Sequence, residues 1–191
     1  MTATAPPTAP ADLIALLGQR QPLYALLDAA RSRKIREYLD KSEVEYQSLL
    51  EGPDVVAMAD YVPYLAAVTP GSRLLATLLH HGWGASWGVF LTTEVDFPTL
   101  RKHLRHFLSV LLPDKQQAFF RFYDPRVLRV FLPACQEAEA AEFFGPITAF
   151  LMEGEDPAEL LVFTPGAPRP QQETVSVTVP ELTDYTTVLP G

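Results

Sequence analysis

The stretch FRFYDPRVLRVFL at residues 120–132 gathers the side chains in this sequence that are best suited to chemistry. Arg121, Tyr123, Asp124 and Arg126 place a carboxylate between two guanidinium groups and beside a phenol. Such a set could take part in acid–base catalysis if a second acid, a base or a nucleophile lay nearby. No such group is evident next to these residues in the sequence. The alternative is that they lock a strand onto a helix.

The segment AFFRFY that leads into this stretch has the composition of a strand. Alternation along it places Phe120 and Phe122 on one side and Arg121 and Tyr123 on the other. We therefore expect the strand to run up to Asp124 and to end there.

Asp124 precedes Pro125, whose fixed φ and missing N–H suit the first turn of a helix. Asp124 is therefore predicted to be an N-cap that accepts hydrogen bonds from the backbone amides of residues 126–128, a role that contributes about 0.5 to 2 kcal/mol. Arg121 or Arg126 can pair with its carboxylate. Because each polar group then has a structural task, the sequence favours a structural lock over an active site.

Other motifs that carry chemistry are incomplete. No glycine-rich phosphate loop is present, and GASWG at residues 84–88 only approaches the G-x-S-x-G elbow around Ser86. His103 and His106 could meet on one helix, but no carboxylate or cysteine stands at a matching spacing. Cys135 has no histidine close in sequence and is expected to be a buried small apolar residue. We therefore expect no catalytic residue, no metal and no cofactor.

Composition indicates a packed protein of a reducing compartment. The 191 residues are 48% hydrophobic and 20% charged, within the range of globular domains. The single cysteine, Cys135, cannot form an internal disulfide. The sequence shows neither a secretory signal nor an apolar run near the roughly 18 to 20 residues of a membrane span. These features predict a cytoplasmic, soluble protein with no membrane partner.

Charge is unevenly distributed along the chain. The net charge is −8, and downstream of Phe131 ten carboxylates stand against Arg169 alone. Phosphate binding requires a basic surface, so this distribution argues against nucleic acid as the main partner. The one basic cluster, RKHLRH at residues 101–106, is expected to form the solvated face of a helix.

Strands alternate with helices early in the chain and hairpins follow, which predicts an α/β protein with a mixed sheet and flanking helices, in one core or two small lobes. Expected helices cover residues 11–19, 33–41, 71–84, 96–108, 126–135 and 136–145, the last two separated at Pro133. Expected strands cover residues 22–28, 45–51, 60–69 and 86–93, followed by hairpins of 109–113 with 118–123 and of 147–154 with 159–166. Pro63 places the third of these strands at an edge or a bulge.

The ends of the chain differ from its middle. Residues 1–11 are rich in Ala, Thr and Pro and are expected to be disordered. Residues 12–166 are expected to form the domain. Residues 167–191 form an acidic, proline-containing tail that should contribute little to the core, although VSVTV at 175–179 alternates like a strand and could add to a sheet edge.

Several segments occur in an order that resembles a known bacterial family. They are PLYALLDAA, YQSLLEG, YVPYLAAV, SWGVFLTT, LRKHLRHFLSVLLPD and FRFYDPRVLRVFLP, within roughly residues 22–151. The family was long catalogued as a domain of unknown function and is associated with type VI secretion, as adaptor chaperones that load toxic effectors onto the VgrG spike. Its most specific motif is the signature carried here by Arg121, Phe122, Tyr123, Asp124, Pro125 and Arg126.

This resemblance implies a non-catalytic cytoplasmic protein whose partners are a cognate effector protein and the VgrG spike protein. The residues fit such a binding platform, and Trp83 is a candidate for the partner surface because tryptophan is favoured at interfaces. The alternative is a small α/β hydrolase or a ligand-binding regulatory protein whose site is assembled from residues distant in sequence. A deep polar pocket around Asp124 and a histidine would favour that alternative.

Overall fold

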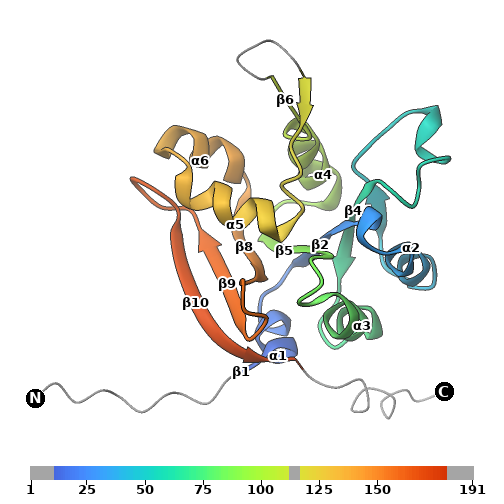
Figure 1. Ribbon diagram of the computed structural model, residues 1–191, viewed down its shortest axis with the longest axis horizontal. Helices are drawn as coiled ribbons and strands as arrows, with labels where there is room; N and C mark the ends of the chain where they lie inside the picture. Colours follow the sequence, from blue (N-terminus) through green and yellow to red (C-terminus); the bar gives the residue numbers. More distant parts are fainter. Residues whose placement is uncertain (1–10, 112–116, 180–191) are drawn as a thin grey trace, which may run out of the picture.

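A mixed sheet of eight strands forms the centre of the computed structural model, which describes residues 11–111 and 117–179 (Figure 1). In spatial order the strands are β1 (Ala11–Asp12), β10 (Gln171–Thr178), β9 (Glu159–Thr164), β8 (Ile147–Glu153), β5 (Gly88–Thr93), β2 (Leu23–Asp28), β4 (Pro63–Val68) and β3 (Tyr46–Ser48). Only β1 and β10 run parallel, and every other neighbouring pair is antiparallel. The predicted α/β class with a mixed sheet is confirmed.

Helices cover both faces of this sheet. One face packs against α1 (Leu13–Gly18), α2 (Arg33–Asp40) and α3 (Arg73–Gly82). The other packs against α4 (Phe97–His106), α5 (Pro125–Ala134), α6 (Glu137–Phe144) and the chain that joins them, which includes the hairpin of β6 (Ser109–Leu111) and β7 (Gln117–Phe119). Short 3-10 turns, η1 (Ala29–Arg31) and η2 (Pro53–Val55), follow β2 and β3. The described residues therefore form three layers around one sheet rather than two lobes.

Side-chain alternation along the strands builds a core on each face. In β2, Leu23 and Leu27 point into the core beneath α1 to α3, whereas Tyr24 and Leu26 point into the core beneath α4 to α6. A strand covered on both faces reads as a continuous apolar run, because both of its alternating sets are buried. This explains why PLYALLDAA lacks the polar–apolar alternation of a half-exposed strand.

Local capping signals set the starts of three helices. The side chains of Ser72, Asp96 and Asp124 accept hydrogen bonds from backbone amides at the first turns of α3, α4 and α5. Pro98 and Pro125 occupy the first turns of α4 and α5, where a missing N–H leaves no bond unmade. The predicted cap at Asp124 is confirmed.

The expectation that Pro63 marks an edge strand or a bulge is wrong. Strand β4 lies inside the sheet, between β2 and β3, and pairs with β2 without a shift in register. Pro63 is accommodated because it is the first residue of the strand, opposite Asp28 at the end of β2. Proline at a strand's first position removes no interior ladder bond.

The strand predicted over AFFRFY is shorter than expected. β7 ends at Phe119, and the chain then turns so that the Asp124 N–H donates to the Arg121 carbonyl at 3.0 Å. Phe122 and Tyr123 are both buried, which strand alternation could not achieve on one covered face. The helix that follows also runs through Pro133 and ends at Ala134, so the break between α5 and α6 lies at Cys135 and Gln136 rather than at Pro133.

The chain after Gly166 includes a strand of the main sheet, β10, which contains most of the VSVTV segment expected to be able to join a sheet edge and begins earlier, at Gln171. Residues 171–176 of β10 pair with β9, and Val177 is buried in the core beneath α1. The alternation in this segment accounts for the pairing, because it gives β10 one apolar side to bury. The calls on residues 1–10 and 180–191 lie outside the described residues.

Truncation will measure what β10 contributes. A chain that ends at Gly166 loses Val177 and the half-buried Val175 from the core, and we expect its free energy of unfolding to fall by about 3 kcal/mol or more. A chain that ends at Val179 keeps the strand and serves as the matched control. Urea unfolding of the two truncated chains and the full chain checks this, and equal midpoints for all three would contradict it.

Candidate functional site

The signature stretch is anchored by Asp28, the last residue of β2. The Asp28 side chain is buried, and one of its carboxylate oxygens accepts a hydrogen bond from the Ala30 N–H at 3.2 Å, which caps η1. The other oxygen accepts a hydrogen bond from the Arg121 guanidinium, 93 residues along the chain. This ion pair joins the end of a central strand to the segment that leads into α5.

Asp124 forms the second half of this arrangement. Its carboxylate accepts hydrogen bonds from the backbone N–H of Arg126 at 3.0 Å, from Nε at 2.9 Å and from a terminal nitrogen of the same side chain at 2.6 Å. The Arg121 guanidinium lies 3.9 Å from Oδ2, the oxygen that also accepts from the terminal nitrogen of Arg126. Arg121 therefore sits between two buried carboxylates, one from the sheet and one from the helix cap.

The electrostatics of these groups keep them charged. Burial raises the pKa of Asp124, but the hydrogen bonds from the Arg126 side chain and backbone outweigh it, and the net pKa lies below the ordinary 3.8. The hydrogen bond to Asp28 raises the pKa of Arg121, and that to Asp124 raises the pKa of Arg126. Asp124 and Arg126 thus remain an ion pair over the whole neutral range.

The remaining signature residues are part of the core. The Phe122 ring is fully buried and lies 5.6 Å from the ring of Phe143 on α6. Tyr123 is buried beside it, with the Arg121 guanidinium 5.9 Å above its ring, and burial raises the pKa of its phenol. Pro125 begins α5. All six signature residues are therefore positioned by contacts within the fold.

A second polar cluster forms around Glu153, the last residue of β8. Its buried carboxylate accepts hydrogen bonds from the Gly84 N–H at 2.6 Å, the Ser86 N–H at 3.0 Å and the Ser86 hydroxyl at 3.1 Å. Ser86 adopts a positive φ of 56°, which turns its amide toward the carboxylate. Burial raises the pKa of Glu153, and these hydrogen bonds oppose the rise.

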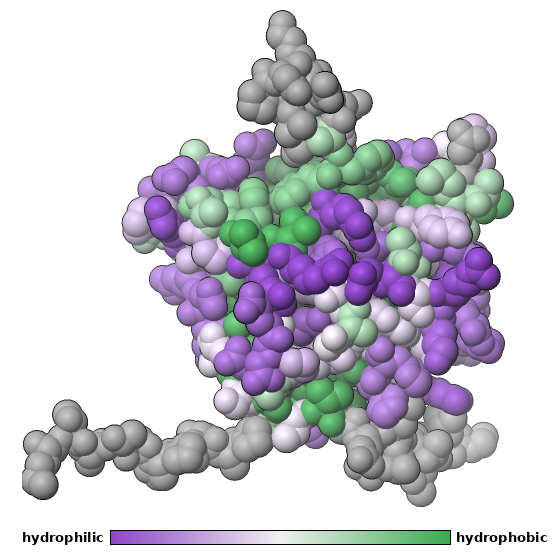
Figure 2. Space-filling model, viewed as in Figure 1, coloured by the Kyte–Doolittle hydropathy of each residue, from purple (hydrophilic) through white to green (hydrophobic). Residues whose placement is uncertain are grey.

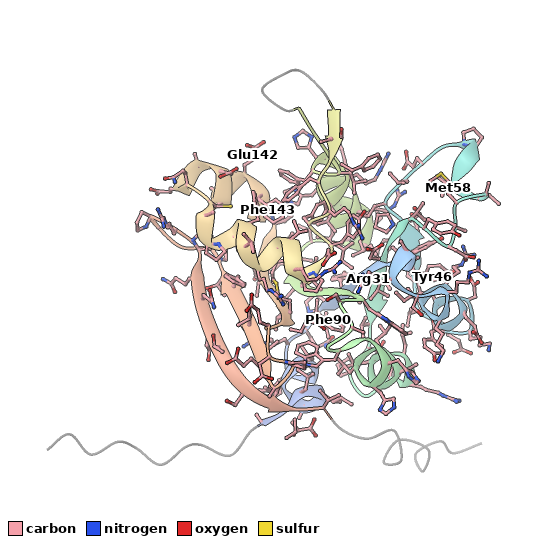
Figure 3. All side chains as sticks on the ribbon, in the orientation of Figure 1. Arg31, Tyr46, Met58, Phe90, Glu142 and Phe143 are labelled. Atoms are coloured by element: carbon pink, nitrogen blue, oxygen red, sulfur yellow. The ribbon has the colours of Figure 1, made fainter. Side chains whose placement is uncertain are left out.

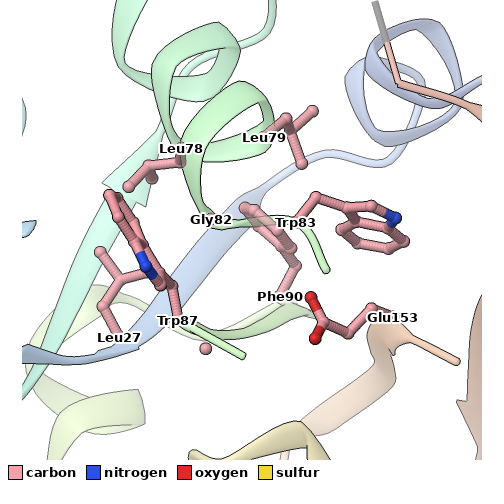
Figure 4. A pocket seen from close by; sticks show the side chains of 9 residues that line it. Leu27, Leu78, Leu79, Gly82, Trp83, Trp87, Phe90 and Glu153 are labelled. Carbon is pink, nitrogen blue, oxygen red and sulfur yellow. The ribbon is translucent and has the colours of Figure 1, made fainter. Parts of the chain in front are cut away.

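Trp83 fastens the same turn to the β8–β9 hairpin. Its indole N–H donates to the Pro157 carbonyl at 2.7 Å, and its half-buried ring lines a small pocket with Trp87, Phe90 and Glu153 (Figure 4). The cavity in this pocket is about 10 Å³, roughly the space of one water molecule. The residue proposed for a partner surface is thus held in place by an intramolecular bond.

Two arginines connect these clusters at one end of the sheet. Arg31 in η1 donates to the Ala85 carbonyl at 3.2 Å, and Arg129 on α5 donates to the Gly154 carbonyl at 2.8 Å. Figure 3 shows Arg31 near the middle of this view, and a strongly hydrophilic band crosses the same part of the surface in Figure 2. The chain therefore brings together charged residues from β2, β8 and α5.

The chemistry available to this arrangement is limited by its own hydrogen bonds. The Ser86 hydroxyl, the group most like a nucleophile, is buried and engaged with Glu153. His103 contacts the Phe143 carbonyl at 2.9 Å, away from that pair. Burial raises the pKa of the Cys135 thiol to about 11, so the reactive thiolate is scarce at neutral pH. Within residues 11–111 and 117–179 no cluster of His, Cys, Asp or Glu could hold a metal ion.

Sequence reasoning did not find Asp28 or Glu153. Each carboxylate ends a strand that is otherwise apolar, and each is bonded to residues more than sixty positions away. The one available signal was a charged residue directly after a buried run, as in PLYALLD. Such a residue must find a hydrogen-bonding partner, but its position does not say which.

Comparison with protein-family models identifies the family of this chain. A family model described as Domain of unknown function (DUF4123) matches residues 23–142. The chain belongs to this family. The DUF4123 match runs from the start of β2 into α6 and contains the whole RFYDPR signature. No curated protein and no solved structure matches the chain. Among the described residues, no helix has the length and apolar character to cross a membrane.

We predict that Arg121 is the principal stabilising residue of the signature in this DUF4123 protein. Arg121→Ala leaves the Asp28 carboxylate buried without its cation, and the free energy of unfolding should fall by about 2 kcal/mol. Arg33→Ala, at an exposed arginine of α2, is the control and should change it by less than about 0.5 kcal/mol. Equal losses in urea unfolding would contradict the assignment, as would an Asp28→Asn background in which Arg121→Ala costs just as much.

The ion pair of Asp124 predicts a definite pH dependence. The folded protein holds the pKa of this carboxyl below 3.8, so its contribution to stability is complete above that pH and is lost as the pH falls through the lowered value. Asp124→Asn retains a good N-cap but removes the charge. The wild type should be more stable than this variant by about 1 kcal/mol near pH 7, and the difference should shrink as the pH falls below 3.8. A gap that stays constant across this range in urea unfolding would refute the ion-pair assignment.

Proposed function

We propose that this DUF4123 protein is a non-catalytic cytoplasmic adaptor that binds a cognate type VI secretion effector and helps to load it onto the VgrG spike. The observation that carries the proposal is the occupation of the signature by structural contacts. Arg121, Asp124 and Arg126 bond to one another and to Asp28, and Phe122 is core. The most specific motif of the family thus stabilises the fold, as expected when the surface of the protein, rather than the motif, binds the partner.

Exposed apolar side chains support a binding role. Val56, Met58 and Tyr61 lie on the segment that joins β3 to β4, and their side chains are 84%, 48% and 59% exposed. Figure 3 labels Met58 on this segment, which projects from the body of the protein. Apolar residues that are clustered on a surface indicate contacts with other proteins. Phe119 and Val130 add two further exposed apolar side chains on the α4 to α6 side.

The alternative of a small hydrolase or a ligand-binding regulator gains no support from the pocket beside Trp83. Its cavity of about 10 Å³ is far below the roughly 300 to 1,000 Å³ of small-molecule sites. The Ser86 hydroxyl donates to Glu153, which lines the pocket, so it is not poised for attack on a substrate. A binding protein accounts for these features without a further assumption.

Co-expression tests the proposed function directly. We expect the affinity-tagged chain to form a stable complex with the product of one gene that neighbours its own, and the two proteins should elute together in size-exclusion chromatography. Failure of every neighbouring gene product to co-elute with a well-folded adaptor would overturn the proposal.

Asp124→Ala provides the matched variant for this experiment. Because the signature supports the scaffold, capture should decline only in step with the folded fraction of the variant, measured by circular dichroism. A variant that unfolds at the wild-type midpoint but captures nothing would show that the signature is itself an interface.

A further inference from the structure

The outer edge of β10 is open along most of its length. β10 pairs with β9 through residues 171–176, whereas β1 covers only Val177 and Thr178 on the other side. Figure 1 shows β10 as the long outer strand of the sheet, with β1 at one end. Within the described part of the chain, six residues of this strand therefore have a partner on one side only.

The register identifies the backbone groups that face outward. The Val177 N–H donates to the Ala158 carbonyl at 2.8 Å, on the β9 side. Backbone groups alternate in direction along an antiparallel strand. The N–H groups of Glu173 and Val175 therefore point toward β9, and those of Gln172, Thr174 and Ser176 point outward. These outward groups form a short hydrogen-bonding template.

This edge lacks the usual protection against strand addition. Natural edge strands are blunted by shortness, lysine, proline or a bulge. At the opposite edge, β3 is only three residues long. Residues 171–176 pair with β9 in unbroken register and contain neither proline nor lysine, and Glu173 is their only charge. Of the two edges of the sheet, β10 is the one that can accept a strand.

We propose that this edge binds an extended segment of the cognate effector, which adds a strand alongside residues 171–176. The inference rests on the proposed function, because the partner is the effector itself. Backbone hydrogen bonds would supply affinity, as in other cases of strand addition. Glu173 on the edge favours a segment that carries lysine or arginine opposite it.

Two other occupants fit less well. A second copy of this chain would bring together two molecules of net charge −8, each with Glu173 on the paired edge. The chain's own residues 5–10 precede β1 but contain Pro6, Pro7 and Pro10. Whichever alternate residues of this segment were to donate N–H groups to β10, a proline would stand among them and leave a donor missing. A partner segment with an unbroken series of N–H donors has neither the charge repulsion of a second copy nor the missing donors of residues 5–10.

A pair of substitutions at Thr174 tests the inference with the neighbouring gene product captured by co-expression. Thr174→Pro removes an outward N–H and leaves the bonds to β9 intact, whereas Thr174→Ala retains the donor. We expect Thr174→Pro to weaken the complex by about tenfold or more in titration calorimetry and Thr174→Ala to leave it unchanged within about twofold. Equal affinities for the two variants would overturn the strand-addition proposal.

Hydrogen exchange on the wild-type chain gives a second readout that does not depend on how Thr174→Pro folds. In the free protein the amides of Gln172, Thr174 and Ser176 should exchange quickly and those of Glu173 and Val175 slowly. All five should be slow in the complex. Outward amides that stay fast in the complex would exclude this edge as the binding surface.

The outcomes separate the inference from the proposed function. Absence of any complex with wild-type protein would reject the adaptor role and the edge together. A complex that is indifferent to Thr174→Pro would reject the edge alone. Outward amides that already exchange slowly in the free chain would also reject the proposal. The occupant would be a second copy if their protection rises with protein concentration, and the chain's own segment if it does not.

Discussion

The buried carboxylate of Asp28 is the constraint on which the arrangement of layers depends. It ends β2, which lies inside the sheet and is buried on both faces, so the charge has little access to water. A buried carboxylate is tolerated only when it is paired and hydrogen-bonded. The cation comes from Arg121, which is fixed at the start of α5 and also approaches Asp124. Satisfying one charge in the sheet therefore sets the position of the chain that enters the helical layer.

The same requirement recurs at the end of β8, on this side of the sheet. Glu153 at the end of β8 holds the turn of residues 84–86 that leads into β5, and Arg129 on α5 bonds to the carbonyl of Gly154. Among the described residues, no buried side-chain nitrogen or oxygen lacks a hydrogen-bond partner. Strand ends, turns and the start of α5 thus form one connected polar network beneath a hydrophilic surface. Apolar packing attaches the helices to the two faces of the sheet, and this polar network stabilises the end of the sheet.

Features that depend on neighbouring residues could be predicted from the sequence, and features that depend on distant pairing could not. Ser72, Asp96 and Asp124 cap helices through amides two or three residues away, so these roles can be predicted from the sequence. Pro63 did not indicate that β3 would pair with the outer side of β4, because whether a strand lies at an edge depends on whether another part of the chain pairs with it. For the site, the cap at Asp124 was predictable, but its link to Asp28 required the fold.

The order of strands divides the sheet into two halves that differ in their relation to the family. The DUF4123 match covers β5, β2, β4 and β3, which are consecutive in the sheet, together with the signature and most of the helices. The other half, β8, β9, β10 and β1, lies outside the match. The two halves are joined where β5 pairs with β8. The matched half thus carries the ion pairs that set the scaffold, and the unmatched half carries the open edge. The edge lies apart from the ion pair of Asp28 and Arg121, so its sequence can change without disturbing that pair.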